Sequence, residues 1–82
     1  MSEISLPALP TEPRPGRYRH YKGKDYRVLG IARHSETLEP LVVYQALYGE
    51  QGWWVRPATM FTEILSAGAG RKVPRFARVA DE

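Results

Sequence analysis

Short segments of strand-forming residues, each bounded by turn residues, fill the middle of this 82-residue chain. Side-chain alternation and an abundance of β-branched and aromatic residues predict strands at 17–21, 26–34, 41–48, 53–57 and 62–66. Turns containing Gly or Pro join them, and Ala58–Phe61 is long enough for only one helical turn. Closing a strongly bent sheet removes its exposed edges. The pattern therefore predicts an all-β fold, a small SH3-like barrel of about five antiparallel strands with one short helical turn.

The two ends of the chain differ from this middle. Residues 1–15 hold four of the seven prolines, which predicts a disordered, Pro-rich leader. The barrel is expected to span residues 16–66. Residues 67–82 begin with small residues and end highly charged. They predict a flexible basic tail that either stays loose or docks along a strand edge through Phe76.

The absence of cysteine restricts both the location and the chemistry. A secreted domain of this size usually carries disulfides, and thiolate zinc sites need the same residue. No apolar run approaches the roughly 18 residues of a membrane span. The N-terminus also lacks the basic start and continuous apolar stretch of a signal peptide. We expect a cytoplasmic protein that does not associate with membranes, and nothing in the sequence indicates a cofactor.

The formal net charge is only +3, but the charges are unevenly distributed. Between Arg14 and His34 there are seven Lys or Arg residues and one acid, Asp25. Between Ser35 and Ser66 there are four Glu residues and one base, Arg56. Pairing of basic and acidic strands within one fold explains this distribution without a ligand. A phosphate-binding patch is the alternative.

Several short motifs follow one another along the segments GRYRHYKGKDYRVLGIARHSET, LEPLVVYQALYGEQGWWVRPATMFTEI and KVPRF. They are Tyr-x-His-Tyr-Lys-Gly, His-Ser-Glu-Thr, a Val-Tyr-Tyr-like strand, Trp-x-Arg-Pro and Met-Phe-x-Glu. This succession resembles a family of short bacterial proteins that is catalogued only as a domain of unknown function. The resemblance runs from about Gly16 to Phe76. It implies an SH3-like barrel in a bacterial cytoplasm and implies no activity.

The two histidines are the first candidates for chemistry. His20 and His34, with Glu36, are residue types that bind divalent metals or transfer protons. Their spacing matches no compact motif, and a histidine that hydrogen-bonds locally to fix a loop is the simpler interpretation. A barrel this small is filled by its own side chains, which leaves only surface grooves. We therefore assign no catalytic residue and no metal ligand.

The adjacent tryptophans are the second candidate. Neighbouring residues of a strand point to opposite faces, so we expect one Trp to enter the core and the other to stay at the surface. Trp54 would then share a face with Arg56 and form an aromatic-basic platform, unless one of the tails covers it. The predicted groove is lined by Tyr21, His34, Tyr44, Trp54 and Arg56. Three further residues, His20, Glu36 and Glu63, are secondary candidates.

Three functions are compatible with these residues. The first is a non-catalytic binding module that recognises a protein, a peptide or a small ligand through the aromatic-basic surface. The second is binding of single-stranded nucleic acid, which the basic first third and the interleaved aromatic residues favour. The third is a metal-dependent or acid-base enzyme that uses His20, His34 and Glu36. The sequence identifies no partner.

Overall fold

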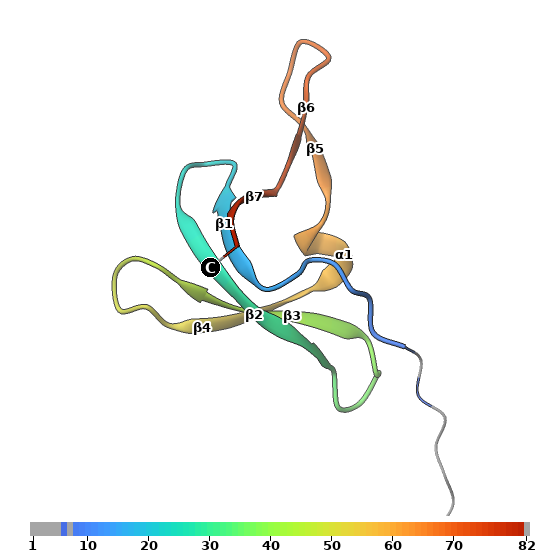
Figure 1. Ribbon diagram of the computed structural model, residues 1–82. Helices are drawn as coiled ribbons and strands as arrows, with labels where there is room; N and C mark the ends of the chain where they lie inside the picture. Colours follow the sequence, from blue (N-terminus) through green and yellow to red (C-terminus); the bar gives the residue numbers. More distant parts are fainter. Residues whose placement is uncertain (1–5, 7, 82) are drawn as a thin grey trace, which may run out of the picture.

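A five-stranded antiparallel sheet forms the body of the protein (Figure 1), seen in a computed structural model that describes residues 6 and 8–81. Along the sheet the strands follow the order β4-β3-β2-β1-β7, and β5 pairs with β6 in a separate two-stranded sheet. The elements are β1 (Gly16–His20), β2 (Asp25–Arg33), β3 (Pro40–Ala46), β4 (Trp53–Pro57), α1 (Ala58–Phe61), β5 (Ile64–Ser66), β6 (Lys72–Pro74) and β7 (Phe76–Ala80). The prediction of an all-β fold with one short helical turn is confirmed.

Tight turns set the order of the first four strands. The turn between β1 and β2 has Gly23 at φ +107, a conformation that Gly adopts without the steric penalty of a side chain. The turn between β3 and β4 has Gly49 at φ +58 and is closed by the Gln51 amide, which donates to the Tyr48 carbonyl at 3.0 Å. Each connection is short, so consecutive strands become antiparallel neighbours.

A bulge divides β2 into two parts, and the side-chain alternation is reversed from one part to the other. The pairing with β3 shifts between Val28 and Gly30, so that Val28 lies opposite Tyr44 and Ile31 lies opposite Val42. One extra residue in a strand reverses the alternation of all side chains beyond it. Ile31 therefore packs against the core, although strict alternation along β2 would place it on the face opposite Val28.

The core lies on the concave side of the sheet, beneath α1. Its fully covered side chains are Phe61, Val28 and Val42, which are at most 1% exposed. The buried rings of Tyr18, Tyr44 and Phe76 complete it. Phe61 stacks on Phe76 with the ring centroids 4.0 Å apart and the planes nearly parallel. Phe61 is therefore the core residue that the short helix contributes.

The end of the chain is more ordered than the sequence suggested. The last predicted strand, 62–66, is shorter in the structure, and residues 72–80 add β6 and β7 where a flexible tail was expected. β5 and β6 form a hairpin that projects from the sheet in Figure 1. β7 then returns along β1, placing Phe76 opposite His20. The tail thus docks through Phe76, which is 6% exposed.

Part of the Pro-rich leader is also packed. Pro13 is buried, and the Arg14 carbonyl accepts hydrogen bonds from the Tyr18 hydroxyl at 2.9 Å and from Arg78 Nη1 at 3.2 Å. Residues 13 and 14 therefore pack against the body of the fold. The prediction for residues 1–5 and 7 falls outside the described part of the chain.

The sheet is open. β4 and β7 are its two edges, and over residues 8–81 no pairing joins them. The closed barrel predicted from the sequence is therefore not observed, and the SH3-like arrangement stays a prediction. None of the helices in the described ranges is long and apolar enough to cross a membrane.

Candidate functional site

Arg56 lies against a cluster of aromatic rings on the concave side of the sheet. It lies opposite Val42 on β3, and its Nε donates to the Tyr44 hydroxyl at 3.4 Å. Its guanidinium carbon lies 5.9 Å from the centroid of the Phe76 ring, within the range of a cation–π contact. The residue is half-buried. Among residues 8–81, no carboxylate oxygen approaches this guanidinium within 4.0 Å.

His20 extends the cluster at the end of β1. Its ring contacts Phe76 edge to face at 4.9 Å and lies 4.6 Å from the ring of Tyr21. Its Nδ1 accepts a hydrogen bond from the Lys22 amide at 3.1 Å, which ties the ring to the turn. Burial lowers the pKa of His20, and the nearby positive charges of Arg56, Arg75 and Lys22 lower it further. The lowered pKa favours the neutral imidazole, whose Nδ1 is the acceptor of the Lys22 amide.

Two tyrosines complete the cluster: Tyr26 lies on β2, and Tyr48 follows the end of β3. The hydroxyls of Tyr26 and Tyr48 lie 2.5 Å apart, and their rings meet edge to face at 5.4 Å. Burial and the hydrogen bond to Tyr48 raise the pKa of Tyr26 to about 12, an increase that the positive charge of Arg56 partly offsets. Tyr48 is 40% exposed and carries the Lys24 ammonium 5.0 Å from its ring centroid. A half-exposed phenol is thus held against a basic side chain.

We call the exposed part of this cluster the aromatic-basic surface, and its residues are His20, Tyr21, Tyr26, Tyr48, Trp54 and Arg56. Trp54 lies opposite Tyr44 in the register of β3 and β4, on the same face as Arg56. The shared face of Trp54 and Arg56 is therefore confirmed. The expectation that one tryptophan enters the core is wrong, since Trp53 is 68% and Trp54 is 60% exposed. The reason is that β4 is an edge strand with only β3 beside it.

Other predicted groove residues occupy different places. Tyr44 is a core residue, 6% exposed, and only its hydroxyl reaches toward the surface, so it does not line a groove. His34 follows the far end of β2, where its Nδ1 accepts from the amides of Glu36 at 3.1 Å and Thr37 at 3.3 Å. Glu63 pairs with Arg75 at 2.7 Å and is a surface ion-pair residue.

The structure does not bring together His20, His34 and Glu36, the residues of the hypothetical metal or acid-base site. His20 is next to the start of β2 and His34 follows its end, so the nine residues of β2 separate them. At about 3.3 Å per residue this distance exceeds 20 Å. Both Nδ1 atoms accept backbone amides, as the local structural interpretation predicted. No group of three potential metal-binding side chains occurs in the part of the chain that the structure describes.

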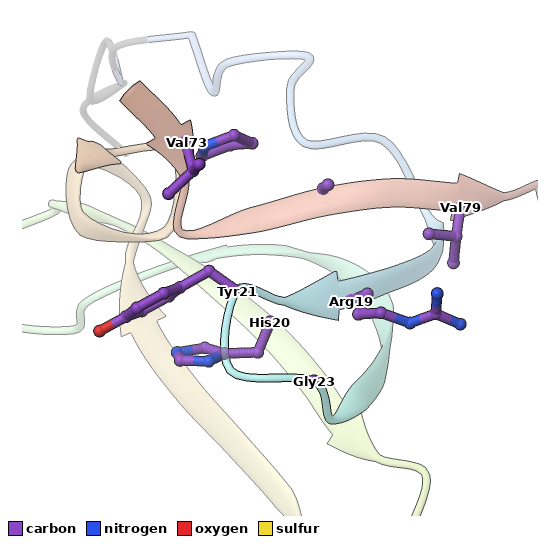
Figure 2. A pocket seen from close by; sticks show the side chains of 8 residues that line it. Arg19, His20, Tyr21, Gly23, Val73 and Val79 are labelled. Carbon is purple, nitrogen blue, oxygen red and sulfur yellow. The ribbon is translucent and has the colours of Figure 1, made fainter. Parts of the chain in front are cut away.

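A shallow pocket of about 390 Å³ lies on the other face of β1 (Figure 2). Arg19 and Tyr21 line it from β1 and the following turn, and Val79 lines it from β7. Val73 and Pro74 line it from the base of the hairpin. In Figure 2 the rings of Tyr21 and His20 lie next to each other at its edge, so the pocket adjoins the aromatic-basic surface. This pocket was not predictable from the sequence, because it depends on the position of β7.

Sequence reasoning also missed Tyr26 and Phe76 as parts of the site. Tyr26 is not among the predicted groove residues, and Phe76 is predicted only as an anchor for the tail. Phe76 touches His20, Tyr26, Tyr44 and Phe61, with centroid distances from 4.0 to 5.8 Å. The signal that would have found it is the pairing of β7 with β1, a long-range contact between residues about 60 positions apart.

Comparisons with known proteins agree on one family. The family model described as a protein of unknown function, DUF1653, matches residues 16–78. A crystal structure of a DUF1653 protein from Bordetella bronchiseptica is similar to this chain, with 46% sequence identity and a TM-score of 0.74, over 84% of this chain and 90% of that one. No curated protein matches. The matched range includes six of the seven strands in full and most of β7. This chain therefore belongs to the DUF1653 family, as the resemblance in its motifs implied.

Proposed function

We propose that this protein is a non-catalytic binding module whose aromatic-basic surface takes an acidic group of a protein or peptide partner. The observation that carries the proposal is Arg56, a half-buried guanidinium held by a neutral phenol and an aromatic ring with no carboxylate within ion-pair distance in residues 8–81. A guanidinium matches a carboxylate with two parallel hydrogen bonds. The cytoplasmic location expected from the sequence stays a prediction.

The surroundings of Arg56 supply a second kind of contact. Trp54, Tyr21 and Tyr48 are all at least 40% exposed, and large exposed rings on a small domain often mark an interaction site. Exposed Trp, Tyr and Arg residues are the types that contribute most to protein interfaces. An acidic residue of the partner would meet Arg56, and an apolar neighbour in the partner would cover Trp54.

The test is a nuclear magnetic resonance titration of the full chain with two peptide pools. One pool alternates Glu or Asp with aromatic residues, and the matched pool carries Gln or Asn at the acidic positions. We expect the acidic pool alone to shift the Arg56 side chain, the His20 ring and the Trp54 indole. The variant Arg56→Gln should weaken this binding by about tenfold or more, since an ion-paired hydrogen bond contributes about 1.5–3 kcal/mol.

Arg71→Gln is the matched control, because Arg71 is exposed and lies between the strands of the β5–β6 hairpin, outside the aromatic-basic surface. It should leave the affinity unchanged. Equal losses in the two variants would mean that net charge alone drives binding. No shift at Arg56 with any acidic peptide would refute the proposal.

The proposal also predicts a pH dependence. An anion held beside Arg56 would favour the protonated form of His20, whose pKa in the free protein is lowered by burial and by Arg56, Arg75 and Lys22. Binding should therefore strengthen as the pH falls below 6.5, the ordinary pKa of the group. His20→Gln should remove that part of the pH dependence, which is measurable by calorimetry in buffers of different ionisation enthalpy.

Binding of single-stranded nucleic acid is the second candidate. What favours it is the placement of lysines over exposed rings, with Lys22 Nζ 5.8 Å from the Tyr21 centroid and Lys24 Nζ 5.0 Å from the Tyr48 centroid. Bases stack on such rings while the lysines meet the phosphates. A short oligonucleotide should then bind most tightly at low salt. Absence of binding at low salt would eliminate this candidate.

A further inference from the structure

We propose that two copies of this chain pair antiparallel along β4, joining their sheets into one continuous sheet. The starting observation is the exposure of three consecutive large apolar residues, Trp53 at 68%, Trp54 at 60% and Val55 at 58%. They occupy both faces of an edge strand. Natural edge strands are usually protected by charges, bulges or a covering segment. None of these protects 53–55 in the described part of the chain, and this inference goes beyond the proposed function.

The backbone of β4 shows which groups are free to pair. The Ala46 amide donates to the Gly52 carbonyl at 3.0 Å, so residues 46 and 52 form a hydrogen-bonded pair. Such pairs alternate with non-hydrogen-bonded ones along antiparallel strands. The following hydrogen-bonded pair therefore involves Trp54. The amide and carbonyl groups of Trp53 and Val55 consequently point away from β3, toward the open edge.

Pro57 then selects one register. It is the next residue whose backbone points outward, and it has no amide hydrogen to donate. Among symmetric antiparallel registers, the one centred on Trp54 places Trp53 opposite Val55 of the second copy, and Val55 opposite its Trp53. In this register every outward amide and carbonyl of these two residues finds a partner. A register centred on Val55 would set Trp53 against Pro57 and lose hydrogen bonds.

The side chains fit the same register. On one face, Trp53 and Val55 of each copy would form one apolar cluster. On the other face, Trp54 would lie directly across from its own equivalent, with Arg56 diagonal to that ring and opposite Gly52 of the second copy. No like charges would meet, because Arg56 is the only charged residue in β4. The strand is therefore complementary to itself in shape and in charge.

The exposed rings supply a large part of the area that a stable pair needs. A large aromatic ring buries about 150–250 Å² when it is fully covered, so four tryptophans that are 60–68% exposed have on the order of 400–600 Å² left to bury. The valines, the strand backbones and the flanking residues add to this area. A specific interface needs about 1,000 Å² in total. A second copy is also the one partner that is always present at the concentration of the chain itself.

Light scattering coupled to size-exclusion chromatography tests the proposal on the full chain. The expected mass is twice the 9.3 kDa of the chain. Val55→Lys should raise the dimer dissociation constant by about tenfold or more, because a charge is costly in an apolar interface. Ile64→Lys is the matched control, since Ile64 is also 58% exposed but lies on β5, and it should leave the mass unchanged.

A cross-link tests the register. The chain has no cysteine, so Trp54→Cys creates a single thiol at the centre of the pairing. Directly opposite Cβ atoms in a non-hydrogen-bonded pair are about 4.5–5.5 Å apart, close enough for a disulfide after a small adjustment. Trp54→Cys should form a cross-linked dimer on mild oxidation. Trp53→Cys faces Val55 of the other copy in this register and should form far less.

Each of these measurements either supports or overturns the proposed dimer. A wild-type mass of 9.3 kDa at every concentration tested would overturn the proposal. So would a dimer that is unaffected by Val55→Lys, provided that circular dichroism shows the variant to be folded. A dimer whose Trp53→Cys variant cross-links as well as its Trp54→Cys variant would overturn the register. These measurements contain no peptide, so they succeed or fail independently of the binding test at Arg56.

Discussion

Replacing Phe76 by alanine should remove a large part of the stability of this protein. The ring is 6% exposed, stacks on Phe61 at 4.0 Å, and meets His20, Tyr26 and Tyr44 edge to face. Removing a buried phenylalanine typically costs about 3–5 kcal/mol, and each well-placed ring pair adds about 0.5–1.5 kcal/mol to simple burial. We therefore expect a loss of about 4 kcal/mol. At roughly 0.05–0.15 kcal/mol per residue, a chain of this size has only about 4–12 kcal/mol to lose.

Equilibrium urea unfolding followed by circular dichroism measures this loss. Val79→Ala is the control on the same strand, because Val79 is 40% exposed and should cost less than about 1 kcal/mol. Phe76→Leu fills most of the space and should recover more than half of the loss. If Phe76→Ala also cost less than about 1 kcal/mol, β7 would be a loosely attached tail, and the assignment of Phe76 to the core would be refuted.

Three further perturbations follow from individual residues. The lowered pKa of His20 means that the folded state binds its proton less well than the unfolded state. The contribution of His20 to the free energy of unfolding should therefore be constant above pH 6.5 and fall as the pH drops below it. His20→Gln should flatten that decline in urea titrations at several pH values. The raised pKa of Tyr26 means that the folded state holds this proton more tightly than the unfolded state. The contribution of Tyr26 to the free energy of unfolding is therefore complete below pH 10 and lost toward pH 12. Tyr48→Phe should lower this pKa only in part, as phenolate absorbance will show, because burial is its largest cause. Gly16→Ala should destabilise the fold by about 1–3 kcal/mol in thermal melts, since Gly16 has φ +151 and a Cβ would lie 2.8 Å from the Ala80 carbonyl oxygen.

Local features of the fold were predictable because they depend on neighbouring residues. The turn at Gly23, the hairpin before Trp53 and the single helical turn at Ala58–Phe61 each follow from a few residues in sequence. The local hydrogen bonds of His20 and His34 were predictable for the same reason. The presence of an irregularity in β2 was predictable, but its exact position was not. A glycine within a strand suggests an irregularity, but the extra residue is located by the pairing with β3.

Tertiary features were less predictable, because they depend on which strands become edges. The pair Trp53–Trp54 has the alternation of a half-buried strand, yet β4 has a neighbour on one side only and both rings are exposed. Phe76 lies in a segment with proline and charges that forms a strand only because β1 offers a free edge. The same dependence explains why Tyr44, assigned to a groove from its place beside Trp54, is a core residue.

The geometry of the candidate site therefore depends on the last strand, β7. Arg56 has an aromatic ring beneath it only because β7 delivers Phe76 to the concave side of the sheet, where His20 and Tyr26 also contact it. The Tyr44 hydroxyl, the other partner of Arg56, belongs to a ring that packs on Phe76 as well. Because Phe76 joins these partners, a loss of β7 would release the arginine along with the strand. A folded unit ending at residue 66 would retain every predicted groove residue and still lack the geometry that makes Arg56 a candidate anion site.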